Sequence, residues 1–472
     1  TKISTDSIKI EHTISKNANN KTMLTFNIEP SSMPIFEEGQ APHLSQDIVL
    51  VIDHSGSMNT SVEAKDSDGK TLENGLSIQD IVIHAARTVA KTLDKNSRLA
   101  IIIFDNKIDI LTNLTIMTEL NCSTICVKIG TIKPNGQTNI WSAIEAAIQM
   151  LNEREDKTRN GNIMMLTDGV PNVSPARGEV ETLKRLRATL NFTSAIYTFG
   201  FGYSLSKGIL YDMAKYANGG MGHIPDGGMI ATVFCNFIGT ILTTVVNNLQ
   251  LHITYSENVN FAINEPIMGD FAYTTNSKTV IIDVGTVQLE QTRHIIMNTE
   301  HLKSGFKYHY TYKIGGQSFK SEINTVNTNT NTNTNTNTNT NTNTNTNTNT
   351  NTNTNTNIDI SDDIMMPNLN EQEVNIQIAR LYTVEMIRKI INYKSTESTE
   401  AAIATFYELE EYFTTKKMED PLSKGLLANI KDQIKVAVTN DIYYKKWGEF
   451  YLDQLSRSLN QEQKPNFKDP GC

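Results

Sequence analysis

The sequence contains few cysteines, and this scarcity excludes two common kinds of scaffold. Four cysteines in 472 residues cannot form a disulfide framework. Cys122 and Cys126 are one turn apart on a predicted helix, but no second pair of ligands completes a zinc site. Cys235 occurs in an apolar helical pattern and is predicted to be a small core residue. The low cysteine content favours a reducing compartment.

The sequence also lacks targeting and membrane-spanning segments. Residues 1–6 do not carry the apolar core of a signal peptide. The longest apolar stretch, residues 229–246, is interrupted by Asn, Gly, Thr and Cys. We therefore predict a cytoplasmic protein with no membrane span.

An excess of basic residues is absent as well. The formal net charge is −9, and Lys and Arg do not cluster with aromatic residues into a stripe, which argues against nucleic acid as a partner. No Gly-x-Gly-x-x-Gly or Walker pattern follows a predicted strand, so a nucleotide site is not indicated. With 38% hydrophobic and 20% charged residues, the chain is long enough for about two to three globular domains.

Polar residues do follow one short apolar strand at regular spacing. Asp53, Ser55 and Ser57 occupy alternate positions directly after the apolar run 48–52. Ligands of open α/β sheets bind just beyond the carboxyl ends of the strands, which is where this loop is expected to lie. One carboxylate and two hydroxyl oxygens, without sulfur or imidazole, suit a small hard cation such as Mg²⁺ or Mn²⁺ better than zinc.

Two further oxygen ligands are expected at the same sheet edge, because three oxygens do not fill an octahedron. Thr138 precedes a predicted helix, and Asp168 follows a predicted strand at 163–166. The predicted metal site therefore consists of Asp53, Ser55, Ser57, Thr138 and Asp168. The alternative is a serine-rich turn with a helix cap beside an unrelated Asp-Gly turn.

Strand and helix patterns alternate around these residues, which predicts an α/β fold with a doubly wound, mainly parallel sheet. Strands are expected at residues 47–53, 98–104, 162–167 and 194–199, and helices at 76–94, 140–151, 179–190, 206–217 and 229–246.

The five predicted ligands occur in the order of a known motif. Asp-x-Ser-x-Ser, a distant Thr and a distant Asp resemble the metal-ion-dependent adhesion site of the von Willebrand factor A domain, and the resemblance extends over residues 46–248. It implies that Ser55, Ser57 and Thr138 touch the metal directly. Asp53 and Asp168 would hold it mainly through water. The open coordination position would accept a carboxylate of a protein partner.

The flanking residues follow other patterns. Alternating strands at 251–255, 279–284, 294–298 and 306–313 predict an antiparallel β-sandwich, joined by strands from residues 7–29, so that the metal domain is inserted in it or flanked by it. Apolar stripes at helical spacing predict a C-terminal helical array packed on the sandwich, with Trp447 in its core. The predicted boundaries are 1–45 for the N-terminal strands, 46–248 for the metal domain, 249–320 for the sandwich, 370–460 for the helical region and 461–472 for the tail.

Residues 327–357 form a strict Asn-Thr repeat. Such a tract cannot bury apolar surface, so disorder is predicted, and repeat expansion inside a loop is favoured over an adhesive role. In composition, this repeat resembles tracts that are frequent in amoebae and in their giant viruses. The acidic stretch 66–69, which follows the predicted metal loop, lacks the closing Glu of a calcium loop and is interpreted as a surface turn.

Two classes of function follow from these patterns. The first is a non-enzymatic adhesion or scaffold module that binds an acidic protein partner through Mg²⁺ or Mn²⁺. The second rests on a further resemblance, to proteins in which a von Willebrand A domain precedes a Hedgehog/intein-type (Hint) module and to plant proteins that pair it with a RING finger. In this second class Gly471 and Cys472 would form a processing junction whose thiol attacks the preceding carbonyl, or the domain would recruit a substrate. The sequence has no Cys/His cluster of a RING, so ligase activity is not assigned to this chain.

Overall fold

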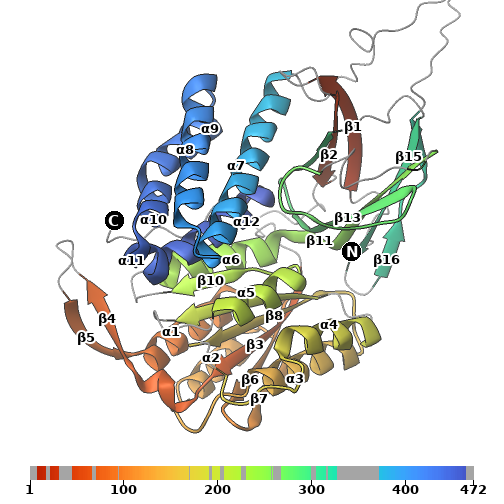
Figure 1. Cartoon of the computed structure of the whole chain (residues 1–472). Coiled ribbons are helices and arrows are strands. Elements are labelled where there is room, and N and C mark those ends of the chain that lie inside the picture. The colour runs from red at the N-terminus through yellow and green to blue at the C-terminus, as the bar shows by residue number, and fades with distance from the viewer. Residues whose placement is uncertain are drawn as a thin grey trace, which may run out of the picture.

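Three packed parts make up the chain in the computed structural model (Figure 1). An α/β domain lies at the bottom of the view, a β-sandwich at the upper right, and a bundle of C-terminal helices, drawn in blue, above the α/β domain. The structure describes residues 8–16, 22–30, 45–65, 71–93, 95–168, 171–190, 194–201, 207–224, 230–256, 258, 267–298, 305–314, 317–326 and 371–463. The Asn-Thr repeat 327–357, the acidic stretch 66–69 and the residues Gly471 and Cys472 lie outside these ranges.

The α/β domain is built on a six-stranded sheet in the order β10-β9-β8-β3-β6-β7, which is parallel except for the edge strand β7. Every residue of the central strand β3 is buried, as expected for a parallel strand that is covered on both faces. The strands are β3 (Gln46–Asp53), β6 (Arg98–Phe104), β7 (Ile108–Ile116), β8 (Asn160–Thr167), β9 (Ala195–Phe201) and β10 (Met221–Ile224).

Helices cover both faces of this sheet, which confirms the predicted doubly wound fold class. One face packs against α1 (Ile78–Thr92), α2 (Glu119–Ile129) and α6 (Ile230–Thr243). The other face packs against α3 (Ile140–Glu153), α4 (Glu179–Leu190) and α5 (Lys207–Tyr216).

A short hairpin, not predicted from the sequence, leaves the domain directly after the predicted metal loop. The 3₁₀ turn η1 (Gly56–Asn59) leads into β4 (Ser61–Lys65), which pairs with β5 (Thr71–Ser77). The predicted helix 76–94 therefore begins two residues late, at Ile78. A capping box sets this start, because the Ser77 hydroxyl accepts from the Asp80 amide while the Asp80 carboxylate accepts from the Ser77 amide.

The sandwich consists of a three-stranded sheet, β1-β2-β14, facing a larger sheet in the order β12-β13-β11-β15-β16, with β17 paired to β15. Both N-terminal strands belong to it, so the α/β domain is inserted between two parts of the sandwich. The strands are β1 (Ile8–Lys16), β2 (Thr22–Pro30), β11 (Thr244–Tyr255), β12 (Ala272–Thr275), β13 (Thr279–Gln288), β14 (Arg293–Asn298), β15 (Phe306–Ile314), β16 (Gln317–Lys320) and β17 (Asn324–Val326).

The predicted helix 229–246 extends too far at its C-terminal end. α6 ends at Thr243, and β11 begins at Thr244 with no loop between them. The β-branched run Thr244-Val245-Val246 favours the strand, and Thr244 pairs with Gln288 of β13. Cys235 was also predicted wrongly, because its side chain on α6 is exposed.

The C-terminal helices share one continuous core with the α/β domain, rather than packing mainly on the sandwich as predicted. Trp447 is 1% exposed in this core, as predicted. A small cluster of Met23, Ile296 and Leu381 joins α7 to the sandwich. The elements are α7 (Glu371–Ser395), α8 (Thr399–Lys416), α9 (Pro421–Asn429), the π-helical turn η4 (Ile430–Ile434), α10 (Lys435–Thr439), α11 (Asp441–Tyr443), the π-helical turn η5 (Tyr444–Gly448) and α12 (Glu449–Asn460). Within the described ranges, no helix combines the length and apolarity needed to cross a bilayer.

Candidate metal centre

The candidate site lies where the direction of the sheet's winding changes. The chain leaves β3 toward β6 on one side, and β8 pairs with β3 on the other side. Loops at such a switch point diverge and leave space beyond the carboxyl ends of the two strands. Asp53 ends β3 and Asp168 follows β8, so the strand register carries both carboxylates to this edge.

Hydrogen bonds connect the side chains of the first loop and of β8. Asp53 is fully buried, and its carboxylate accepts the Ser55 amide at 2.8 Å and the Thr167 hydroxyl at 2.5 Å. The Ser55 and Ser57 hydroxyl oxygens are 3.1 Å apart, and the Ser57 hydroxyl donates to Asp168. Four of the five predicted ligands therefore belong to one connected cluster.

The loop that contains Thr138 is fixed to both neighbouring loops through its backbone. The Gly56 amide donates to the Gly136 carbonyl at 3.1 Å. The Thr138 amide donates to the Asn172 side chain at 3.0 Å, and the Thr138 carbonyl accepts the Asn172 amide at 2.9 Å. Thr138 is 2% exposed and lies between the loops that follow β3 and β8.

Gly136 is required by the geometry of this loop. Its φ of +71° is disfavoured for other residues, and an added Cβ would lie 2.5 Å from an Asp105 carboxylate oxygen. A side chain at this position would therefore displace the loop that carries Thr138.

The electrostatics of the cluster favour a bound cation. Burial raises the pKa of Asp53 to about 6, against the hydrogen bonds from Thr167 and Ser55, and the charge of Asp168 raises it further. Burial also raises the pKa of Asp168, although the hydrogen bond from Ser57 opposes it. The groups that act on Asp53 are thus hydroxyls, an amide and a second carboxylate. A divalent ion would relieve the repulsion between two carboxylates that share a buried corner.

The donor set fits a hard cation. Two carboxylates and three hydroxyls are oxygen ligands of the kind that Mg²⁺ and Mn²⁺ prefer. Within the part of the chain that the structure describes, no group of three or more His, Cys, Asp or Glu side chains could hold a metal ion, so a zinc-type centre is not formed there. Ser57 is exposed and Asp168 is partly exposed, which leaves one side of the cluster open to a partner.

The residues that position these ligands were not predicted from the sequence. Thr167 stands directly before Asp168, and its hydroxyl reaches Asp53 because the two strands pair in register. Asn172 follows the same loop and holds Thr138. The polar residues after β8 are visible in the sequence. Their role in positioning the ligands follows only from the pairing of β8 with β3.

The chain is similar to proteins of known fold. A family model described as von Willebrand factor type A domain matches residues 48–170, and one described as VWA / Hh protein intein-like matches residues 420–472. A von Willebrand factor type A structure from Catenulispora acidiphila is 12% identical with a TM-score of 0.61, covering 96% of this chain and 98% of that one. The ArnB paralog VWA2 from Sulfolobus acidocaldarius is 14% identical with a TM-score of 0.55, covering 98% and 100%. No curated protein matches the chain.

Proposed function

From the premise that this chain carries a von Willebrand factor type A domain, we propose that it is a metal-dependent protein-binding module. The observation that supports the proposal most directly is the joining of three separate loops, with two carboxylates and three hydroxyls, at one switch point of the sheet. The proposed metal ligands are Asp53, Ser55, Ser57, Thr138 and Asp168.

Some of these residues would bind the ion directly, and others would balance its charge. The hydroxyls of Ser55, Ser57 and Thr138 would contact the cation, and Asp53 and Asp168 would supply the negative charge around it. Bound Mg²⁺ or Mn²⁺ would supply a positive centre that accepts a carboxylate oxygen from a partner. Thr167 would orient Asp53 from behind.

The proposed partner is a protein that presents an aspartate or glutamate side chain. The exposed Val173, whose amide donates to the Thr138 carbonyl at 3.3 Å, would contact apolar atoms beside that carboxylate. The net charge of −9 makes a direct, metal-free attraction of an acidic partner unfavourable, so binding should depend on the ion.

Capture in the presence and absence of the metal tests this function. The full chain is immobilised and exposed to cell extract in Mg²⁺, in Mn²⁺ and in EDTA, and bound proteins are identified. A partner should be retained with either metal, lost in EDTA and lost with Asp53→Ala. The exposed Asp109 provides a control, and Asp109→Ala should retain the partner. Equal retention in EDTA would contradict the proposal.

A second candidate function is supported by the family match over residues 420–472, which describes an intein-like region. In this proposal the chain is the N-terminal part of a self-processing precursor. The Cys472 thiol adds to the Gly471 carbonyl carbon, the peptide C–N bond breaks, a thioester forms and the Cys472 amine is released. Water then attacks the thioester, which frees the Cys472 thiol and leaves a carboxylate on Gly471. Intact-mass analysis of a product extended beyond Cys472 tests it. Cleavage should stop with Cys472→Ala.

The same match also fits a substrate-recruiting scaffold related to the proteins that pair this domain with a RING finger. In that case a partner would bind the metal centre and no cleavage at Gly471 would occur.

A further inference from the structure

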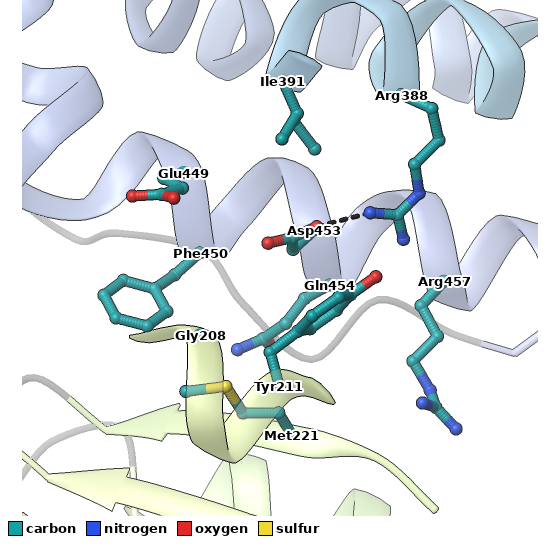
Figure 2. A pocket seen from close by; sticks show the side chains of 10 residues that line it. All are labelled: Gly208, Tyr211, Met221, Arg388, Ile391, Glu449, Phe450, Asp453, Gln454 and Arg457. Carbon is teal, nitrogen blue, oxygen red and sulfur yellow. Dashed lines mark hydrogen bonds and ion pairs between the residues drawn. The ribbon is translucent and has the colours of Figure 1, made fainter. Parts of the chain in front are cut away.

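A cavity separate from the candidate metal centre lies between the α/β domain and the C-terminal helices (Figure 2). Its volume is about 210 Å³, and one wall comes from α5 and β10 while the other comes from α7 and α12. The lining residues are Gly208, Tyr211, Met221, Arg388, Ile391, Glu449, Phe450, Asp453, Gln454 and Arg457, and none of them is a proposed metal ligand.

The most unusual of these residues is Gln454. Its side chain is 7% exposed, and in the described part of the chain neither its amide nitrogen nor its amide oxygen has a hydrogen-bond partner. Buried amide groups are almost always paired in folded proteins, because an unpaired one costs about 1–3 kcal/mol. A ligand oxygen in the cavity would accept a hydrogen bond from the amide nitrogen.

Arg457 provides a positive charge on the same face of α12. Its guanidinium donates to the Gln461 side chain at 3.3 Å, and among the described residues no carboxylate is bonded to it. Burial lowers the pKa of this guanidinium, and the electrostatic influence of Tyr211, Tyr197 and the Asp270 carboxylate opposes that shift. The side chain of Arg457 is partly buried, and a cation in such a place without a bonded anion is unfavourable, so an anionic ligand would offset part of that cost.

The neighbouring carboxylates are already bonded to other cations. Asp453 accepts from Arg388 at 2.5 Å, and Asp270 is 2.8 Å from Arg388 and 2.9 Å from Lys215. Arg388 is therefore neutralised by protein groups, whereas Arg457 is available. Arg457 also lines a smaller adjoining cavity of about 70 Å³ that reaches toward the sandwich.

The rest of the cavity is apolar. Met221, Ile391 and Phe450 line it, and the ring of Phe450 is held in place by stacking on His223 with centroids 4.1 Å apart. Glu449 lies beside Phe450, on the side of the cavity lining opposite Arg457 (Figure 2). A negative group is therefore accommodated at the Arg457 end only. At ~30 Å³ per water the space equals about seven waters, which is the size of a small organic acid.

We propose that this cavity binds a small aliphatic carboxylate, with its carboxylate on Arg457, an oxygen on the Gln454 amide and its hydrocarbon chain against Met221, Ile391 and Phe450. The guanidinium matches a carboxylate in a bidentate arrangement. Since both walls belong to different parts of the chain, the ligand stabilises the contact between the α/β domain and the C-terminal helices.

Titration calorimetry and thermal unfolding of the full chain test the proposal with acetate, butyrate and hexanoate as probes. Butyrate and hexanoate should bind more tightly than acetate, and each should raise the melting temperature. Butyramide, which has the same shape without the charge, should not bind. Equal binding of butyramide, or binding of inorganic phosphate in place of the aliphatic acids, would overturn the proposal.

Three variants separate binding from folding. Arg457→Met removes the charge at similar length, and it should weaken butyrate about tenfold to hundredfold while the unliganded melting temperature is unchanged or higher. Gln454→Leu should weaken butyrate by about threefold to tenfold. The control is Gln433→Leu, since Gln433 is 4% exposed and its amide nitrogen also lacks a partner, but it does not line the cavity. Butyrate binding that is unchanged in both cavity variants, or weakened equally by the control, would overturn the assignment.

Discussion

Two carboxylates in this molecule, the fully buried Asp53 and the largely buried Glu462, face opposite surroundings. Asp53, at the edge of the central sheet, accepts hydrogen bonds from neutral groups and lies near a second carboxylate, and burial raises its pKa to about 6. Glu462, after α12, lies among cationic groups from two other segments. Burial opposes its ionisation as well, but Arg380 and the hydrogen bond from His294 outweigh burial and bring its pKa to about 2.

The contacts of Glu462 are made entirely within the protein. Its carboxylate accepts the His294 amide at 2.6 Å and one N–H of Arg380 at 3.0 Å. Arg380 is 2% exposed, and its other N–H groups bond Gln377 and the carbonyls that end α12. Glu462 thus ties β14 to α7 at the end of the helical region.

The comparison separates a carboxylate that is paired with cations of the protein from one that is not. A carboxylate that stabilises the fold is paired with cationic side chains of the protein, as Glu462 is. A carboxylate that lacks such neighbours and lies at an open sheet edge is suited to take a cation from solution. This difference supports the metal-binding proposal for Asp53 and predicts opposite consequences when either residue is changed.

The largest expected effect is the loss of metal binding in Asp53→Ala. Calorimetry on the full chain should show about one Mg²⁺ or Mn²⁺ site, and the variant should bind at least about a hundredfold more weakly, because it loses a fully buried carboxylate that would balance the charge of the ion. Circular dichroism should be unchanged. Asp109→Ala serves as the control, and unchanged affinity in Asp53→Ala would refute the assignment.

Removing the charge of Glu462 should instead destabilise the helical region. Glu462→Gln leaves Arg380 buried without its carboxylate, and we expect a loss of about 3–5 kcal/mol in unfolding free energy. Urea unfolding followed by Trp447 fluorescence, in a Trp141→Phe background, reports on this region. Glu419→Gln in the exposed pair with Lys424 should cost less than about 0.5 kcal/mol. Similar urea midpoints for Glu462→Gln and Glu419→Gln would contradict a stabilising role of Glu462.

Lowering the pH should destabilise the protein through protonation of Glu462. The pKa of Glu462 is about 2 in the folded chain, against 4.5 as its ordinary value, so the unfolded chain takes up the proton first. The stability that Glu462 contributes is complete above about pH 4.5 and is lost as pH falls toward about 2. Urea midpoints across this range should fall less steeply in Glu462→Gln than in the unmodified chain. Parallel slopes would contradict the prediction.

A smaller effect is expected behind the metal centre. Thr167→Val keeps the shape of the side chain but removes the hydroxyl that donates to Asp53, and we expect Mg²⁺ affinity to fall roughly tenfold. Thr198 is a buried threonine of the same sheet whose hydroxyl donates to the Leu210 carbonyl. Thr198→Val should leave Mg²⁺ affinity unchanged. If both variants bind Mg²⁺ equally well, Thr167 does not position Asp53.

The sequence predicted well wherever a short stretch carried its own signal. The buried run before Asp53 and the alternation of strands with helices identified the α/β fold, and the resemblance to the von Willebrand A domain agrees with the family match. Errors arose where two signals overlapped. Apolar residues of α6 continue into β11 without a break, so periodicity alone did not reveal the change at Thr244. The exposure of Cys235 likewise depends on which face of α6 packs against the neighbouring elements.

The sequence by itself determined which residues end the central strands, because hydrophobic runs and the polar residues after them are local. Tertiary structure decided which of those residues meet. Thr167 and Asp53 are 114 positions apart, and His294 and Glu462 are 168 apart, so their contacts depend on strand register and on helix docking. The cavity beside Gln454 and Arg457 has the same origin, since its walls belong to segments that come together only when the helices pack on the α/β domain. Local patterns fix each element, but the free energy of packing selects their neighbours.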